Sequence, residues 1–593
     1  MREKWSVYAK RADFYDIGEK FDIDPVVARV IRNRDIENYE DIDKYLNGTD
    51  LSGYDVTLMK DMDKGCLIMM DKIRQGKSIR IVSDYDVDGI MSNYILYDAL
   101  KGAGAKISYE IPDRMLDGYG INERIIEDAY ADGVDTIITC DNGIAAFPAI
   151  ELAKKYGMTV IVTDHHEVPF DMDENGDKQY RIVPADAVID IKQPDCSYPF
   201  KEICGATVAY KFIRRLYELM GLGWENEDRY IEMVGLATVC DIMLLQDENR
   251  IYVKRALQII KDTKNVGLKA LLIVNGLTDR KITAYDFGFV LGPCFNATGR
   301  LESAKVGLSL LLCEDEERAL KEAESILKIN TERKSMTEDG TKKAIEIVEA
   351  GFKDDNILVL YVPNLHESLA GIVAGRLKER YYRPTLVFTD GNEGLLKGSG
   401  RSIDGYNMFE ELSKCRELFV KFGGHEMAAG FTIEKDNLER LRQMLLDAQH
   451  LSEDDLTYKV HIDVAMPFSY ISEKLISDLD KLEPYGNGNP KPLFAQSNLS
   501  VIGLRLLGKD GQFGRITLQD ETGNRIEAMD FRINNFIDNI KMWFGERECD
   551  KMLDGQPNNI KINVAYHPSI NLYNGKIYIQ IRPDRYQKYT QEE

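Results

Sequence analysis

The chain has 593 residues, of which 44% are hydrophobic and 30% charged, and its formal net charge is −23. This length predicts three or four globular domains, and the negative charge argues against broad, nonspecific coating of nucleic acid while leaving room for a local basic channel. No segment reaches the roughly 18 uninterrupted apolar residues of a membrane span, and residues 1–14 lack the apolar core of a secretory signal. Nine cysteines without a C-x-x-C pair predict reduced thiols, a cytoplasmic location and no zinc site.

Residues 1–60 form a polar lead-in with a helix expected near residues 25–34. From residue 61 to residue 313, strand and helix patterns alternate, which predicts an α/β domain built on a doubly wound parallel sheet. Helices are expected near 61–75 and 90–102, and strands at 79–82, 106–111, 134–139, 159–162 and 187–191.

Three of the expected strands end in acids or imidazoles. These residues are Asp84, Asp86 and Asp88 after the first strand, Asp141 after another, and Asp164, His165 and His166 after a third. Because parallel strands end at one edge of a sheet, this pattern predicts a ligand-binding crevice. Each segment alone also fits an ordinary turn. Together they predict a metal-dependent hydrolase, since carboxylates with imidazole suit Mn²⁺ or Mg²⁺ and a cation would hold three neighbouring carboxylates together.

The rest of the chain predicts three further parts. Residues 314–352 are expected to form a long, solvent-exposed connector helix, with a break near Gly340 as an alternative. A second, smaller α/β domain covers 353–452, with strands near 357–361 and 384–388 and a helix near 368–380. Residues 453–593 contain short strands and hairpin turns, which predict a small β-barrel. Before these parts, a helix near 235–241 delivers Asp241, which is either a further metal ligand or an ordinary helix-end residue.

The motifs, in their order along the chain, resemble the RecJ-type single-stranded-DNA-specific exonucleases of the DHH phosphoesterase superfamily. The matching segments are 84–89, 111–114 with 118–120, 139–143, 164–166, 292–301, 398–402, 423–430 and 484–494. The resemblance implies a DHH catalytic domain at 61–313, a DHH-associated domain at 353–452 and an OB-like nucleic-acid-binding domain at 453–593. Departures from the family pattern indicate a divergent member; they are Cys240-Asp241-Ile242 without the usual proline, 190–194 in place of an Asn-Pro pair, and Thr207 in place of a glycine.

The resemblance also implies the roles of the site residues. Two divalent ions, Mn²⁺ or Mg²⁺, would be held by Asp86, Asp88, Asp141, His165 and Asp241. Asp84 and Asp164 would orient the motif backbone and the imidazole, and His166 would be either a ligand or an electrophile near the scissile phosphate. The catalytic set would comprise Asp141, His165, His166 and His425.

The DNA phosphates would meet Arg114, Arg300, Ser399, Arg401, Ser402 and His425. The three arginines are expected in glycine-containing loops, with a surface ion pair as the alternative for each. A basic stretch at 376–383, which includes Tyr381 and Tyr382, either stacks bases and binds phosphates or is a helix end whose charged groups reach solvent.

The implied activity is 5′-to-3′ hydrolysis of single-stranded DNA to 5′-mononucleotides, in DNA repair and recombination. The implied protein is a monomer that does not bind membranes, with single-strand-binding protein and a helicase as partners. One alternative is a DHH-family nanoRNase or cyclic-dinucleotide phosphodiesterase. Another is a catalytically inactive, replisome-associated scaffold.

Overall fold

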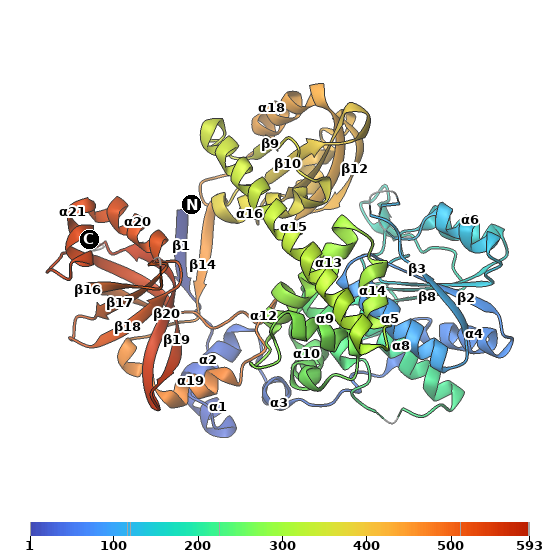
Figure 1. Ribbon diagram of the computed structural model, residues 1–593, viewed down its shortest axis with the longest axis horizontal. Helices are drawn as coiled ribbons and strands as arrows, with labels where there is room; N and C mark the ends of the chain where they lie inside the picture. Colours follow the sequence, from blue (N-terminus) through green and yellow to red (C-terminus); the bar gives the residue numbers. More distant parts are fainter. Residues whose placement is uncertain (1, 115–116, 119, 225, 510, 591–593) are drawn as a thin grey trace. The chain divides into compact units, whose positions relative to one another are not determined.

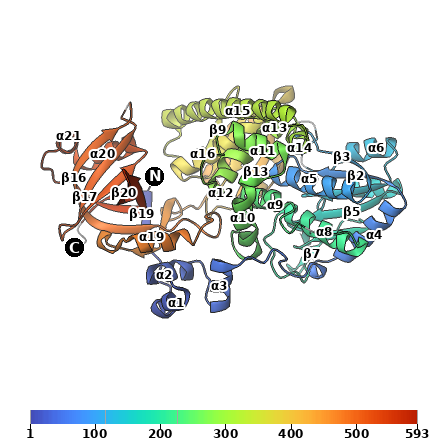
Figure 2. The same ribbon diagram turned by 60° about the horizontal axis from the view of Figure 1, so that its bottom comes forward.

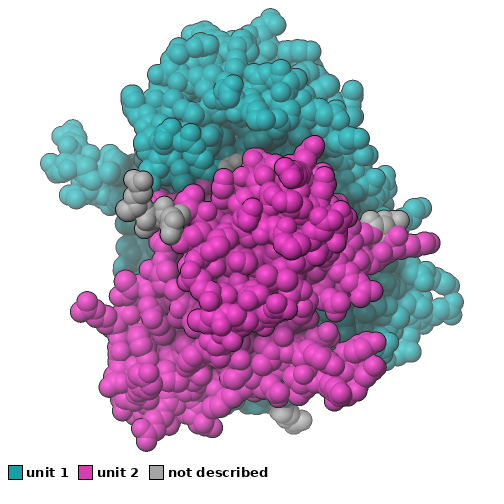
Figure 3. All heavy atoms as spheres, turned by 90° about the vertical axis from the view of Figure 1, so that its left-hand side faces the viewer, with its two compact units in different colours: residues 1–2, 49–458 teal, residues 3–48, 459–593 magenta. Residues whose placement is uncertain are grey.

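The computed structural model describes residues 2–114, 117–118, 120–224, 226–509 and 511–590. The chain divides into two compact units, which Figure 3 distinguishes by colour. One unit contains residues 49–458, and the other contains residues 3–48 together with 459–593. The N-terminal segment therefore shares a unit with the C-terminal domain, although the two stand at opposite ends of the sequence.

The larger α/β domain, drawn mainly in blue and cyan in Figure 1, is built on a five-stranded parallel sheet with the order β3-β2-β4-β5-β8. The strands are β2 (Ser78–Ser83), β3 (Lys106–Glu110), β4 (Thr136–Cys140), β5 (Thr159–Asp164) and β8 (Ala187–Asp190). Side chains alternate between the two faces: Ile79 and Ile81 enter one core, and Val82 enters the other. The chain runs outward in opposite directions from β2, so the point between β2 and β4 is the topological switch point. The predicted doubly wound sheet is confirmed.

Helices cover both faces of this sheet. On one face lie α4 (Met62–Arg74), α5 (Val87–Gly102) and α8 (Gly205–Met220); on the other lie α6 (Glu123–Ala131) and α7 (Phe147–Lys155). A helical layer follows with α9 (Ile231–Cys240), α10 (Asp247–Ile259), α11 (Val266–Val274), α12 (Ala284–Asp286), α13 (Gly292–Leu301) and α14 (Lys305–Leu311). A short hairpin of β6 (Phe170–Met172) and β7 (Lys178–Tyr180), which was not predicted, follows the histidine doublet.

The connector is one unbroken helix, α15 (Glu316–Gly351), whose length is seen in Figure 2. Its first half contributes Ala323 to the core of the larger domain, and its second half contributes Val348 to the core of the smaller one. The predicted long helix is therefore present, and the alternative of a break near Gly340 is wrong. A Cβ there would lie 2.6 Å from Leu365 Cδ1, so the glycine allows close packing rather than ending the helix. The helix is exposed on one side only.

The smaller α/β domain has a five-stranded sheet with the order β12-β13-β11-β10-β9. Its strands are β9 (Leu358–Tyr361), β10 (Thr385–Asp390), β11 (Leu395–Arg401), β12 (Phe419–His425) and β13 (Ala428–Glu434). Only β9 and β10 pair in parallel. The helices are α16 (Ala370–Tyr381), α17 (Met408–Ser413) and α18 (Leu438–Ala448), and α16 packs against α15.

The second unit contains a closed barrel of five strands in which β16 pairs with both β17 and β19. The strands are β16 (Phe494–Leu507), β17 (Phe513–Gln519), β18 (Arg525–Asp530), β19 (Lys561–Tyr573) and β20 (Lys576–Lys588), with α20 (Ile533–Phe544) and α21 (Glu546–Leu553) between β18 and β19. The predicted barrel is confirmed. The remaining elements are β1 (Arg2–Val7), α1 (Phe14–Phe21), α2 (Pro25–Asn33), α3 (Tyr39–Asn47), β14 (Thr457–Ile462), β15 (Val464–Ala465) and α19 (Glu473–Asp480).

A buried ion pair ties the N-terminal helices to the C-terminal domain. Arg34 Nη1 and Nη2 donate to the two carboxylate oxygens of Asp463, over 2.7 and 3.1 Å. Asp463 also accepts hydrogen bonds from Asn33 Nδ2 and from the Leu493 amide. Because the two buried charges are paired and the carboxylate has further donors, the second unit is held together by polar contacts as well as by its apolar core.

Candidate metal centre

The acids and imidazoles expected to bind metal lie at the carboxyl edge of the large sheet, at and beside its switch point. The loops after β2, β4 and β5 bring in the predicted strand-end residues, and the last turn of α9 ends at Asp241. One acid at this edge was missed: Asp190 ends β8 and pairs in register with Asp164 of β5. Its position at a strand end was the signal that could have found it.

The loop after β2 is tight because it turns directly into α5. Asp86 is the N-cap residue of this helix, and its carboxylate accepts a hydrogen bond from the Gly89 amide over 3.1 Å. A Cβ on Gly89 would lie 2.3 Å from the Asp84 carbonyl oxygen, so only glycine fits this turn. The loop therefore presents three acids within five residues at one point of the sheet edge.

The carboxylate of Asp88 is fixed by the N-terminus of another helix. Its two oxygens accept hydrogen bonds from the Gly205 and Ala206 amides of α8, over 2.6 and 2.7 Å. Free amides and the helix dipole stabilise an anion at this position. The helix approaches closely because residue 205 is a glycine, whose Cβ would otherwise lie 2.7 Å from Asp141 Cβ.

The loop after β4 holds Asp141 in a left-handed conformation, with a φ of 60°. The next residue, Asn142, braces the sheet edge: its Nδ2 donates to the carbonyls of Val82 and Cys140, over 3.0 and 2.9 Å, and its Oδ1 accepts from the Ile121 amide. Asn142 thus links the ends of β2 and β4 and positions Asp141. The sequence motif contained this asparagine, but its bracing role could not be inferred from spacing.

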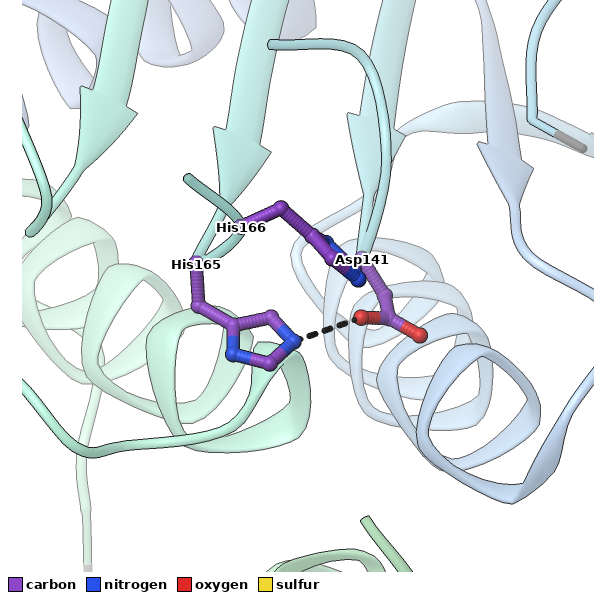
Figure 4. A group of neighbouring side chains, drawn as sticks. All are labelled: Asp141, His165 and His166. Atoms are coloured by element: carbon purple, nitrogen blue, oxygen red, sulfur yellow. Dashed lines mark hydrogen bonds and ion pairs between the residues drawn. The ribbon is translucent and has the colours of Figure 1, made fainter. Parts of the chain in front are cut away.

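The two neighbouring histidines lie beside Asp141, with their ring centres 4.5 Å apart, and make different contacts; Figure 4 shows the one between His165 and Asp141. His165 is 6% exposed, and its Nε2 lies 3.0 Å from Asp141 Oδ1, 3.5 Å from Asp88 Oδ2 and 3.6 Å from Asp241 Oδ2. His166 instead places Nδ1 2.7 Å from Asp164 Oδ1. One imidazole nitrogen therefore faces three carboxylates, as expected for a shared ligand sphere.

Asp164 orients both histidines. One of its oxygens accepts hydrogen bonds from the amides of His165 and His166, and the other accepts from the Ile144 amide over 2.9 Å. Burial alone would raise the pKa of Asp164, but the charge of His166 and its hydrogen bond lower that pKa to about 2. The same partnership outweighs burial at His166 and raises its pKa to about 9. Asp164 and His166 therefore form an ion pair at neutral pH.

The other acids of the centre have raised pKa values. Burial, and then repulsion from Asp88 and Asp86, raises the pKa of Asp241 to about 9 and that of Asp141 well above its usual range. Burial and neighbouring acids likewise raise the pKa of Asp84 and of Asp86. Burial lowers the pKa of His165, which favours the neutral imidazole that a metal requires.

These residues fit divalent cations. Three groups each bring their ligand atoms within 4.8 Å of one another, and they are Asp141 with His165 and His166, Asp88 with His165 and Asp241, and Asp84 with Asp86 and Asp141. The buried atoms Asp84 Oδ1 and Asp241 Oδ2 have no hydrogen-bond donor in the described part of the chain. Hard oxygen donors with one or two imidazoles suit Mn²⁺ and Mg²⁺, and adjacent groups with shared residues suit two ions.

Three arginines expected to bind phosphate have neutral partners. Arg114 lies over the ring of Tyr85, 4.9 Å from its centre; Arg300 donates to the Ser368 carbonyl; and Arg401 donates to Ser399 Oγ. Among the residues described, no carboxylate lies within 4.0 Å of these three guanidinium groups, so the ion-pair alternative does not apply. Burial, and then the charges of Arg114 and Arg333, lower the pKa of Arg300 to about 9.

The expected placement in loops is wrong for two of these three arginines. Arg300 lies in the last turn of α13 and Arg401 ends β11; only Arg114 lies in a loop. The glycines that suggested a loop serve packing in β11, where a Cβ on Gly398 would lie 2.4 Å from the ring of Phe431. Of the motif at 118–120 near Arg114, Tyr119 lies outside the described residues.

Within the described residues, two further predicted side chains form no hydrogen bond or ion pair with the metal centre. His425 is exposed at the end of β12, and its Nδ1 accepts a hydrogen bond from the Met427 amide. Ser402 is buried, and its hydroxyl donates to the Tyr406 carbonyl. Ser402 therefore supports the turn after β11, whereas His425 is open to a ligand.

Most of the basic stretch at the end of α16 has local partners. Arg383 donates to the carbonyls of Tyr381 and Tyr382, which close the helix C-terminus, and Tyr381 OH donates to Glu349. These contacts favour the helix-end interpretation for this part. Arg376, one and a half turns earlier, points instead toward α15, where its Nη1 lies 3.4 Å from Thr341 Oγ1.

Comparison with known sequences follows the same domain order. The DHH family, N-terminal domain, matches residues 78–238; the DHHA1 domain matches 354–450; and the RecJ OB domain matches 462–584. The single-stranded-DNA-specific exonuclease RecJ of Bacillus subtilis (strain 168) is 33% identical over 523 residues, which span 88% of this chain and 64% of the relative. RecJ of Escherichia coli (strain K12) is 31% identical over 513 residues, which span 82% of this chain and 86% of the relative.

The fold also has a solved counterpart. The crystal structure of RecJ in complex with Mn²⁺ from Thermus thermophilus superposes with a TM-score of 0.81 at 24% identity, covering 100% of this chain and 80% of that one. The family expected from the ordered motifs is thus confirmed, and so is the fold class. The chain belongs to the RecJ family of single-stranded-DNA-specific exonucleases, within the DHH superfamily.

Proposed function

We propose that this protein is a two-metal exonuclease that hydrolyses single-stranded DNA from the 5′ end to 5′-mononucleotides, in DNA repair and recombination. The observation that carries the proposal is the meeting of Asp88, Asp141 and Asp241 around His165 Nε2. Arginines without carboxylate partners, which suit phosphates, stand in the same unit. The RecJ relative from Thermus thermophilus was crystallised with Mn²⁺, which supports this choice of ion here.

The metal site would be formed by Asp86, Asp88, Asp141, His165 and Asp241. Bound divalent ions supply a hydroxide at neutral pH and stabilise charge on the phosphate oxygens. Asp88 holds its geometry through the α8 amides, so it can bind a cation without a change in the loop. Asp84 adds a buried oxygen that lacks a donor, next to Asp86 and Asp141.

His166 is assigned the role of an electrophile rather than a general base. The carboxylate of Asp164 raises its pKa to about 9, so the imidazolium form prevails at neutral pH. A cation at this position stabilises negative charge on a phosphate or donates a proton to a leaving oxygen. Its side chain is 43% exposed, which leaves it accessible to a substrate.

Phosphate binding is assigned to Arg114, Arg300 and Arg401, with Ser399 orienting Arg401. Arg300 and Arg401 donate to neutral oxygens, and Arg114 lies over a tyrosine ring, so all three would gain charge-assisted hydrogen bonds from a phosphate. His425 is proposed as an additional contact because it is exposed at a hairpin. Ser402 acts indirectly, by holding the turn that follows Arg401.

Product analysis tests the proposal and separates it from its alternatives. The substrates are a long 5′-phosphorylated single strand, its blunt duplex and a dinucleotide, each with Mn²⁺. We expect mononucleotides from the single strand only, and none from the Asp141→Ala variant. Cleavage confined to the dinucleotide would indicate a nanoRNase, and binding of the single strand without cleavage would indicate a scaffold.

The proposal also assigns roles to the domains and gives the oligomeric state, location and partners of the enzyme. Residues 61–313 would carry catalysis, 314–352 the connection to the domain at 353–452, and 453–593 the grip on a single strand. A monomer that works in the cytoplasm with single-strand-binding protein and a helicase fits this role. All nine cysteines are unpaired thiols, which fits a reducing compartment. No helix in the described residues combines the length and apolarity that crossing a membrane would need.

A further inference from the structure

Two more arginines have neutral partners only: Arg333, which was not predicted to bind phosphate, and Arg376, which begins the basic stretch at 376–383. Arg333 lies in the middle of α15, and its Nε and Nη2 donate to Asn330 Oδ1 over 3.1 and 3.0 Å. Arg376 lies in α16, 3.4 Å from Thr341 Oγ1 of α15. Neither has a carboxylate within 4.0 Å among the described residues.

Other arginines of this chain, whose net charge is −23, pair with carboxylates. Arg318, on the same helix as Arg333, donates to Glu322 one turn away over 2.7 Å. Arg442 of the smaller domain forms an ion pair with Asp355 over 2.6 Å. Arg318 and Arg442 thus have carboxylate partners, whereas Arg333 and Arg376 contact neutral oxygens only.

The two arginines continue the set that begins near the metal centre. Helix α15 packs against both α13, which carries Arg300, and α16, which carries Arg376. At the start of α16, a Cβ on Gly371 would lie 2.8 Å from Arg401 Nη2. Five residues separate Gly371 from Arg376, a rise of about 7.5 Å along the helix. Arg376 therefore lies farther along α16 than the point that Arg401 approaches, and on another side of the helix, where it faces α15.

Positive charges repel one another along the series Arg114, Arg300, Arg333 and Arg376. Burial is the largest cause that lowers the pKa of Arg300, and the charges of Arg114 and Arg333 lower it further. Burial likewise lowers the pKa of Arg333, and the charge of Arg376 adds to this effect. A row of partly buried cations without counter-ions is unfavourable in the free protein. Phosphates spaced along a nucleic-acid backbone are ligands that would relieve the repulsion at several points at once.

We propose that Arg333 and Arg376 form a second phosphate subsite, which binds a backbone phosphate of the single strand away from the one that is cleaved. This inference rests on the proposed exonuclease function and extends it to substrates longer than a dinucleotide. The subsite favours long strands because only they occupy it and the metal centre together.

The test compares Arg333→Gln, Arg376→Gln and the double variant with the wild type and with Arg318→Gln. Arg318 is the matched control because it lies on the same helix but has its own carboxylate. Binding of a long, labelled single strand is measured by fluorescence anisotropy in EDTA over a range of salt concentrations. A plot of log K against log [salt] has a negative slope. For single strands, each lost phosphate contact makes that slope shallower by about 0.7.

We expect the slope to become shallower by about 0.7 to 1.4 in the double variant and to stay unchanged in Arg318→Gln. With Mn²⁺, we expect kcat/KM for the long strand to fall about 10- to 100-fold, since charge-assisted contacts are lost, while hydrolysis of a 5′-phosphorylated dinucleotide is kept. Arg333→Lys and Arg376→Lys should preserve most of the slope, because they keep the charge.

Two results would overturn the subsite. One is an unchanged salt slope and an unchanged kcat/KM for long strands in a double variant with a wild-type melting temperature. The other is an equal loss for the dinucleotide and the long strand, which would place these arginines at the reacting phosphate. If the double variant fails to fold, the single glutamine variants decide, since each should change the slope by about 0.7. Failure of the wild type to cleave any strand would refute the proposed function instead, and the binding slope would still report on the subsite.

Discussion

Metal binding should release protons at neutral pH, because the free site holds protons on acids that a metal requires deprotonated. Asp241 has a pKa raised to about 9 by burial and by Asp88 and Asp86, so about 99% of it is protonated at pH 7. The pKa of Asp141 is raised well above its usual range by the same kind of surroundings. Loading the site should therefore release at least one proton, from Asp241.

The number of protons released determines how steeply the affinity for metal rises with pH. If one proton leaves per loaded protein, the overall association constant rises about 10-fold for each unit of pH between 6 and 8. The stability of the metal-free protein changes with pH in the opposite direction. Its folded state keeps a proton on Asp241 that the unfolded chain loses near pH 3.8, so its stability falls as pH rises from about 4 toward about 9.

Isothermal titration calorimetry of Mn²⁺ into chelator-treated protein measures the release. Titrations at pH 7 in buffers with different ionisation enthalpies give the number of protons from the slope of the observed heat. Asp241→Asn should release about one proton fewer than the wild type. His166→Gln decides between the two roles of His166, because its pKa is raised to about 9. Unchanged release means that the imidazolium persists as an electrophile, and one proton fewer means that His166 is a ligand.

The reasoning would be refuted by a wild-type release near zero at pH 7. It would equally fail if Asp241→Asn still bound Mn²⁺ and released as many protons as the wild type. Asp247→Asn provides a matched control, since this acid lies in the neighbouring helix α10 and bonds to Tyr54. Its replacement should leave the count unchanged.

Three further predictions test other parts of the structure. Gly89→Ala places a Cβ 2.3 Å from the Asp84 carbonyl, so we expect a loss of about 1–3 kcal/mol in urea unfolding and a larger loss of activity; wild-type kinetics would contradict the tight turn. Arg34→Ala leaves Asp463 buried without its partner and should cost about 3–5 kcal/mol in the transition of the unit that contains it; a cost under about 1 kcal/mol would show that the pair is dispensable. Mn²⁺ at about 100 times its Kd should stabilise the protein by about 2.7 kcal/mol in thermal scans, and Asp141→Ala should abolish this gain.

Local sequence patterns were sufficient for the large sheet and for most of the metal centre. Apolar runs followed by acids predicted both the strands and the edge at which their ends meet, because the side-chain arrangement of a parallel sheet is set by strand direction. The sequence also contained a signal for the unpredicted β6–β7 hairpin, since Asn175-Gly176 is a common turn pair. The metal-ligand assignments themselves stay predictions.

The errors came from glycines, because local rules treat them as breaks. At Gly340 the rule predicted a helix break, but the structure uses the missing Cβ to bring Leu365 close. At Gly398 the rule predicted a loop, but Phe431 packs on the glycine within a strand. Contacts between residues distant in sequence decide such cases, and they are not visible in a window of neighbouring residues.

The anchoring of Asp88 and the partners of the arginines are distant contacts of the same kind. The α8 amides stabilise the Asp88 carboxylate, and His166 stabilises that of Asp164, so these two charges are already compensated within the protein. At Asp141 and Asp241, burial and neighbouring acids outweigh the stabilising contacts and keep both pKa values raised, while Arg300 and Arg376 bond to neutral oxygens. Were these acids and arginines paired with one another, neither would be available to a ligand. Charges of both signs, held apart on separate elements, give a strongly acidic protein one site for cations and another for phosphates. The overall charge of −23 is therefore compatible with binding DNA, because binding depends on these local charges and not on their sum.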